Sequence, residues 1–90
     1  MTGELEKLKM KMQQHLEGKI SGADIVRAID DFVANDHVYR LPEEICKRVL
    51  SLQDNVAFYV ESPVERKEYP AYFGGEKLKE IVFLFLKGYI

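Results

Sequence analysis

Apolar residues recur at intervals of three and four along most of this chain, the spacing of an amphipathic α-helix. The first such stretch predicts a helix over Glu4–Glu17, with Gly18 ending it. A second helix is predicted from Ser21, whose hydroxyl can cap the free amides of the first turn, to about Asn35. The expected buried stripes of these two helices are Leu5, Leu8, Met12, Leu16, Ile25, Ile29, Phe32 and Val33.

A third helix is predicted from Pro42, which suits a first turn because it lacks an amide hydrogen. Its apolar residues step by four and three, which is typical of a seam packed in a bundle. That seam is Ile45, Val49, Leu52, Val56 and Tyr59. A last helix is predicted after Gly74 and Gly75. Because the apolar face of this helix is broad, we expect the helix to lie centrally in the bundle. That face consists of Leu78, Ile81, Val82, Phe83, Leu84, Phe85 and Leu86.

These stretches predict one all-α domain over residues 1–90, because a chain of 90 residues has room for a single core. An α+β alternative stays open. Val56–Val60 and Ile81–Leu86 are rich enough in β-branched and aromatic residues to form buried strands. Between them, Glu61–Gly75 is predicted to be a long loop, and long ordered loops are often functional.

The composition, with 47% apolar and 31% charged residues, is that of a globular protein. A single cysteine, Cys46, excludes an intramolecular disulfide, and the start of the chain is charged rather than apolar. We therefore expect a cytosolic protein with no membrane segment. No metal or other cofactor is expected, since the two histidines and Cys46 have no recognised ligand spacing.

No motif for nucleophilic, metal-dependent or phosphate-binding chemistry occurs in the sequence, so we do not expect an enzyme. A small enzyme or ligand-binding bundle stays open as an alternative, and it requires a pocket with convergent polar groups. His15 is expected at the edge of the core and Cys46 within it as a small apolar residue.

Charge is uneven along the chain. Residues 22–62 hold eight acidic against four basic residues, whereas both flanking segments have a net charge of +1. An acidic middle disfavours nucleic-acid binding and favours a basic protein partner.

One group of carboxylates has little neutralisation from nearby bases. Asp54 and Glu61 have no base three or four residues away, and Glu65 and Glu68 follow in the predicted loop. Grouped carboxylates repel one another unless solvent or a partner supplies cations, so these four are candidate binding residues. Tyr69 and Tyr72 are candidate packing anchors beside them. An ordinary solvated surface, with aromatic residues that only anchor the loop or fill the core, stays open.

Several segments of the chain resemble the colicin D immunity proteins and the wider colicin-like immunity family, which includes immunity proteins of contact-dependent inhibition. The resemblance runs from about Leu5 to Leu86 and rests on the order and spacing of four segments. These are Gly18-Lys19-Ile20-Ser21, Ala23-Asp24-Ile25-Val26, Glu61-Ser62-Pro63-Val64-Glu65-Arg66 and Gly75-Glu76-Lys77-Leu78-Lys79-Glu80-Ile81-Val82.

The resemblance implies an antiparallel four-helix bundle without catalytic activity. Such a protein binds a cognate nuclease toxin, typically one that cleaves transfer RNA, and its acids occupy the basic surface that holds RNA. The matching positions are Glu61 and Glu65, and more loosely Asp54 and Glu68. Val64 departs from the family pattern, which is often acidic there. A non-inhibitory adaptor, for instance a homodimer through the apolar face of the last helix, is the main alternative.

Overall fold

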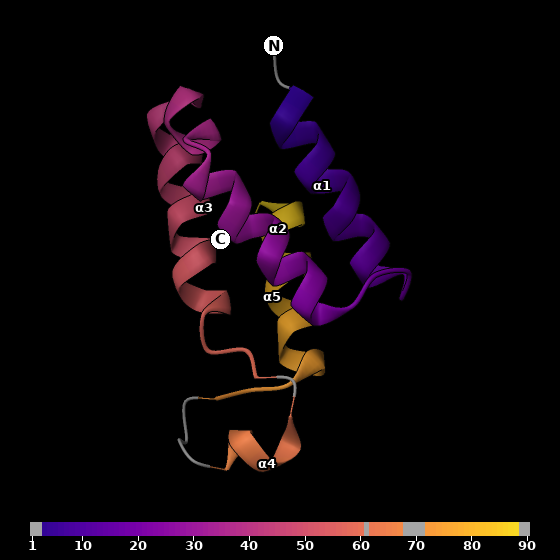
Figure 1. The fold of residues 1–90 in the computed structure, drawn as a ribbon. Helices are drawn as coiled ribbons and strands as arrows, with labels where there is room; N and C mark the ends of the chain where they lie inside the picture. Colours follow the sequence, from indigo (N-terminus) through magenta and orange to yellow (C-terminus); the bar gives the residue numbers. More distant parts are fainter. Residues whose placement is uncertain (1–2, 61, 68–71, 89–90) are drawn as a thin grey trace.

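The computed structural model describes residues 3–60, 62–67 and 72–88, and every regular element within them is helical (Figure 1). The long helices are α1 (Gly3–Leu16), α2 (Gly22–Ala34), α3 (Glu43–Val56) and α5 (Gly75–Lys87). Two short helical segments connect them, the 3₁₀ turn η1 (His37–Arg40) and the single-turn α4 (Pro63–Arg66). The all-α prediction is confirmed for these residues. The strand alternative is wrong for Ile81–Leu86, which lies within α5.

Local signals at the helix ends account for where the long helices start and stop. The Ser21 hydroxyl accepts a hydrogen bond of 3.1 Å from the backbone amide of Asp24, as the capping prediction requires. Pro42 occupies the N-cap position of α3, one residue before its expected place in the first turn. At the end of α5, Gly88 takes a left-handed conformation with φ of 85°, which glycine adopts without steric cost.

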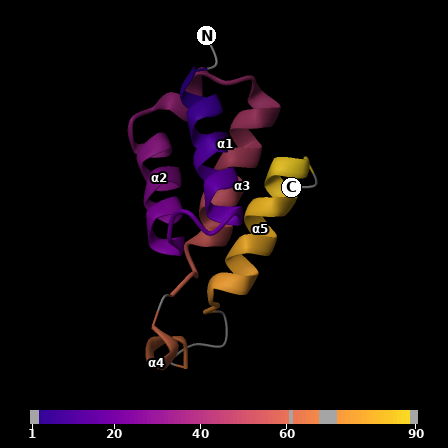
Figure 2. The same cartoon turned by 90° about the vertical axis from the view of Figure 1, so that its right-hand side faces the viewer.

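The core lies where the long helices meet. α1 packs against α2 and α5, and α3 packs against α2 and α5. Figure 2 shows the four helices side by side, with α4 beyond their ends. Most residues of the predicted stripes are buried, since helical spacing directs them to one side. The buried apolar residues are Leu5, Leu8, Met12, Ile25, Ile29, Phe32, Val38, Val49, Leu52, Val56, Leu78, Val82 and Phe85.

The predicted seam of α3 is wrong at its end, because the helix stops at Val56 and Tyr59 lies outside it. Tyr59 instead forms an isolated parallel bridge with Phe73. The Val60 amide donates to the Phe73 carbonyl at 3.0 Å, and the Phe73 amide donates to the Phe58 carbonyl at 3.2 Å. These hydrogen bonds use backbone groups that a longer helix would have needed, so pairing with a distant segment sets the end of α3.

The loop predicted over Glu61–Gly75 is only partly irregular, because it contains α4. Pro63 occupies the first turn of α4, where its missing amide hydrogen is not needed. Figures 1 and 2 both show α4 projecting past the end of the long helices, near the end of α3 and the start of α5. The segment therefore presents its described residues at one end of the molecule.

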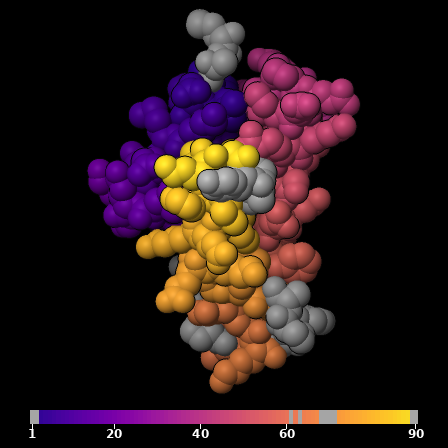
Figure 3. Space-filling model, turned by 180° about the vertical axis from the view of Figure 1, so that it is seen from behind, coloured from indigo at the N-terminus to yellow at the C-terminus, as the bar shows by residue number. Residues whose placement is uncertain are grey.

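The broad apolar face of α5 does not place this helix at the centre of the molecule. Figure 3 shows α5 on one outer face, between α1 and α2 on one side and α3 on the other. Leu78, Val82 and Phe85 are buried, but Phe83 is 45% exposed. Within the described residues, no helix combines the length and apolar character needed to cross a membrane.

His15 is more deeply placed than predicted, with 3% of its surface exposed. Its Nδ1 lies 3.1 Å from the carbonyl oxygen of Ile20, in the turn that follows α1. This contact ties the end of α1 to the turn leading into α2. Cys46 was expected within the core but is only half-buried, packed against the core beside the apolar seam of α3.

Candidate functional site

Two of the four carboxylates predicted to bind a partner, Asp54 and Glu65, lie on or near the projecting end of the molecule. Asp54 is exposed in the last turn of α3, and Glu65 is exposed on α4. Tyr72 is half-buried just before Phe73. The other three predicted residues, Glu61, Glu68 and Tyr69, lie outside the described residues.

The side chains of Asp54 and Glu65 have no ion pair or hydrogen bond with any described residue. By contrast, Glu43 at the other end of α3 pairs with Lys47 at 3.3 Å. Asp54 also lies at the negative end of the helix dipole, and the last turn of α3 contains no basic residue. An incoming cation would therefore relieve unfavourable electrostatics at Asp54 as well as pair with it.

Two apolar side chains within four residues of these acids in the sequence are exposed. Phe58, just after α3, is 48% exposed, and Val64 on α4 is 75% exposed. Exposed large apolar residues next to unpaired charges are typical of protein-docking surfaces. We call Asp54, Phe58, Val64 and Glu65 the acidic-apolar surface.

The sequence analysis did not single out Phe58 as a candidate binding residue. A usable signal was nevertheless present. Phe58 lies two residues after Val56 and one before Tyr59, off the apolar stripe that those two residues continue. A residue off the stripe at a helix end is expected to face solvent.

Two close approaches hold the projecting segment to the helices. The ring centroids of Tyr59 and Phe73 are 6.4 Å apart, and Tyr59 also packs over Gly22 at the start of α2. In the second close approach, the Arg66 guanidinium lies directly against Gly74, at the start of α5. A Cβ atom at either position would collide with the neighbouring side chain, so alanine there requires the Tyr59 ring or the Arg66 guanidinium to move.

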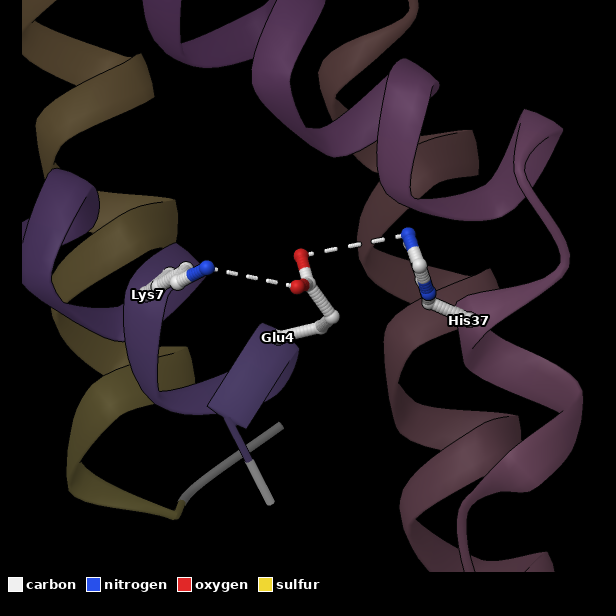
Figure 4. Close-up of polar contacts among 3 residues, drawn as sticks. All are labelled: Glu4, Lys7 and His37. Carbon is white, nitrogen blue, oxygen red and sulfur yellow. Dashed lines mark hydrogen bonds and ion pairs between the residues drawn. The ribbon is translucent and has the colours of Figure 1, made fainter. Parts of the chain in front are cut away.

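A second polar group lies away from this surface. One carboxylate oxygen of Glu4 is 3.8 Å from His37 Nε2, and the other is 3.4 Å from Lys7 Nζ (Figure 4). The His37 ring also contacts Phe32, with centroids 5.6 Å apart. No sequence signal predicted this group, because η1 brings His37 to the start of α1 only through tertiary packing.

Within the described part of the chain, no cluster of three histidine, cysteine or acidic residues is arranged to hold a metal ion. Comparison of the chain with models of protein families, with curated proteins and with solved structures finds no match.

Proposed function

We propose that this chain is an immunity protein that binds a cognate nuclease toxin, of the transfer-RNA-cleaving kind, and blocks its basic active-site surface. The observation that carries this proposal is the acidic-apolar surface, in which Asp54 and Glu65 are exposed without partners beside Phe58 and Val64. The resemblance to colicin-like immunity proteins points to the same end of the molecule.

In this mechanism the carboxylates occupy positions that RNA phosphates would otherwise take on the toxin. Lysine, arginine or histidine side chains of the toxin pair with Asp54 and Glu65, together with Glu61 and Glu68. Exposed apolar groups such as Phe58 and Val64 are buried at the contact and exclude water from the charge pairs. Tyr69 and Tyr72 are proposed to pack beside them.

The proposed scaffold is an antiparallel four-helix bundle. Each long helix packs against two others, which supports this arrangement, and short connections favour antiparallel neighbours. In such a bundle the connection between the third and last helices is free to project, because the core is complete without it. The helices then position the binding surface, and the last turn of α3 contributes Asp54 to the contact with the toxin.

The test is capture of the toxin domain encoded next to this gene, followed by transfer-RNA cleavage with and without this protein. The double variant Asp54→Lys/Glu65→Lys is expected to bind about 30-fold more weakly or worse, because breaking a desolvated charge pair costs about 2–5 kcal/mol. Higher salt should weaken binding of the unaltered protein.

The matched control is Glu6→Lys/Glu44→Lys, which changes the net charge equally. Both residues are exposed in first helical turns, and Figure 2 shows those turns at the end away from α4. Equal weakening by both double variants would mean that net charge, and not the acidic-apolar surface, attracts the toxin. Unchanged binding by Asp54→Lys/Glu65→Lys would refute the site assignment.

One observation favours the adaptor alternative. Phe83 is 45% exposed on the outer face of α5, with Lys87 Nζ 5.6 Å from its ring centroid. A homodimer through this face would bury that ring. Sedimentation of the unaltered protein and of Phe83→Lys separates the two functions: a dimer that the substitution dissociates favours the adaptor, and a monomer favours the immunity protein.

A further inference from the structure

A hollow of about 430 Å³ lies between α1 and α2, on a different part of the molecule from the acidic-apolar surface. Its lining comes from both helices and from His37 of η1. Figures 1 and 2 show the start of α1 and the connection from α2 to α3 at the opposite end from α4. The volume falls within the range of small-molecule sites in proteins.

The two walls of this hollow carry opposite charges. Lys7 and Lys11 line the α1 wall one turn apart, and Asp31 lines the α2 wall. Lys7 is paired with Glu4 (Figure 4). Among the described residues, Lys11 and Asp31 form no ion pair or side-chain hydrogen bond, either with each other or with a third residue. Each wall therefore offers one unpaired charge to a ligand.

The floor and rim between these charges are apolar. Leu8 and Phe32 form part of the buried core beneath the hollow, and Ala28 lines it between the two helices. Met10, also part of the lining, is 64% exposed. Methionine side chains adapt to apolar groups of varied shape, so Met10 is suited to cover a bound ring.

We propose that this hollow binds a small zwitterion with an aromatic or branched apolar group, of the size of an amino acid or dipeptide. The ligand's carboxylate pairs with Lys11, its ammonium group pairs with Asp31, and its apolar group lies over Ala28 under the Met10 side chain. The proposal is independent of toxin binding, because no residue of the acidic-apolar surface lines the hollow.

The test is titration of the isotope-labelled protein, followed by amide shifts in NMR spectra. The three ligands share a phenyl ring: phenylalanine carries both charges, phenylpropionate only the carboxylate, and phenethylamine only the ammonium. Phenylalanine is expected to bind most tightly, with a dissociation constant on the order of 1 mM, and to shift residues of both α1 and α2. Each singly charged ligand should bind about tenfold more weakly.

Two substitutions of exposed residues assign the charges. Lys11→Gln should weaken the binding of phenylalanine and of phenylpropionate about tenfold and leave the binding of phenethylamine unchanged. Asp31→Asn should weaken the binding of phenylalanine and of phenethylamine and leave the binding of phenylpropionate unchanged. The matched controls are Lys9→Gln on α1 and Asp24→Asn on α2, which do not line the hollow and should change nothing. The proposal would be overturned if phenylalanine caused no amide shifts. It would also be overturned if the three ligands bound equally well to the unaltered protein and to every variant.

Discussion

Substitution of Gly22 by alanine tests whether packing of Tyr59 holds the projecting segment to the helices. An added Cβ would lie 2.5 Å from Tyr59 Oη and 2.9 Å from Leu78 Cδ2, both too close for van der Waals contact. The backbone of Gly22 is not left-handed, so alanine suits the helix itself. The Tyr59 ring therefore has to move, and with it the bridge to Phe73.

The magnitude follows from two opposing effects. Overpacking of a well-packed site costs about 1–3 kcal/mol, whereas replacing glycine by alanine in a helix gains at most about 1 kcal/mol. We expect Gly22→Ala to lower the free energy of unfolding by about 1–2 kcal/mol. In a chain of this size that lowers the melting temperature by roughly 4–16 °C.

Thermal and urea unfolding followed by circular dichroism give the free energy of unfolding. Gly75→Ala is the matched control, since Gly75 is also the first residue of its helix and nothing lies within 4 Å of its added Cβ. Gly75→Ala should be neutral or slightly stabilising. In a Tyr59→Ala background, Gly22→Ala should lose most of its cost, because the ring is gone and only the contact with Leu78 Cδ2 remains. Equal stability of Gly22→Ala and Gly75→Ala would refute the packing argument.

Three further substitutions test other contacts, the first two by the same unfolding measurement. Ser21→Ala removes the side-chain cap of α2 and should cost about 1 kcal/mol, and no loss would mean that water replaces the cap. Arg48→Met keeps the side-chain stem but removes two contacts, the 3.0 Å hydrogen bond to the Phe85 carbonyl and the cation 5.0 Å from the centroid of the Phe85 ring. We expect the free energy of unfolding to fall by about 1–2 kcal/mol. Gly74→Ala places a methyl group against the Arg66 guanidinium, and here limited proteolysis is the measurement. We expect faster cleavage of the projecting segment, and an unchanged cleavage rate would contradict this expectation.

Helical periodicity predicted the parts of the fold that depend on local spacing. Val49, Leu52 and Val56 are buried as expected, because residues three and four apart share a helix face wherever that helix packs. Tyr59 obeys the same spacing, but the bridge to Phe73 removes it from the helix. Phe73 is distant in sequence, so no local pattern contains that information.

The candidate site divides in the same way. The exposure of Asp54 without a partner was predictable, because a helical residue meets its neighbours three and four positions away, and none of these is basic. The hollow between α1 and α2 was not predictable. Lys11 and Asp31 belong to different helices, and only the packing of those helices places them on facing walls.

The bridge between Tyr59 and Phe73 brings together the two ends of the segment that projects from the helices. The ends therefore stay in place whatever sequence joins them, and the entropy of closing a loop rises only slowly with its length. We therefore expect substitutions or insertions between these two ends to cost the helical core little stability. The bridge thus makes the stability of the helical core largely independent of the composition of the segment that it closes.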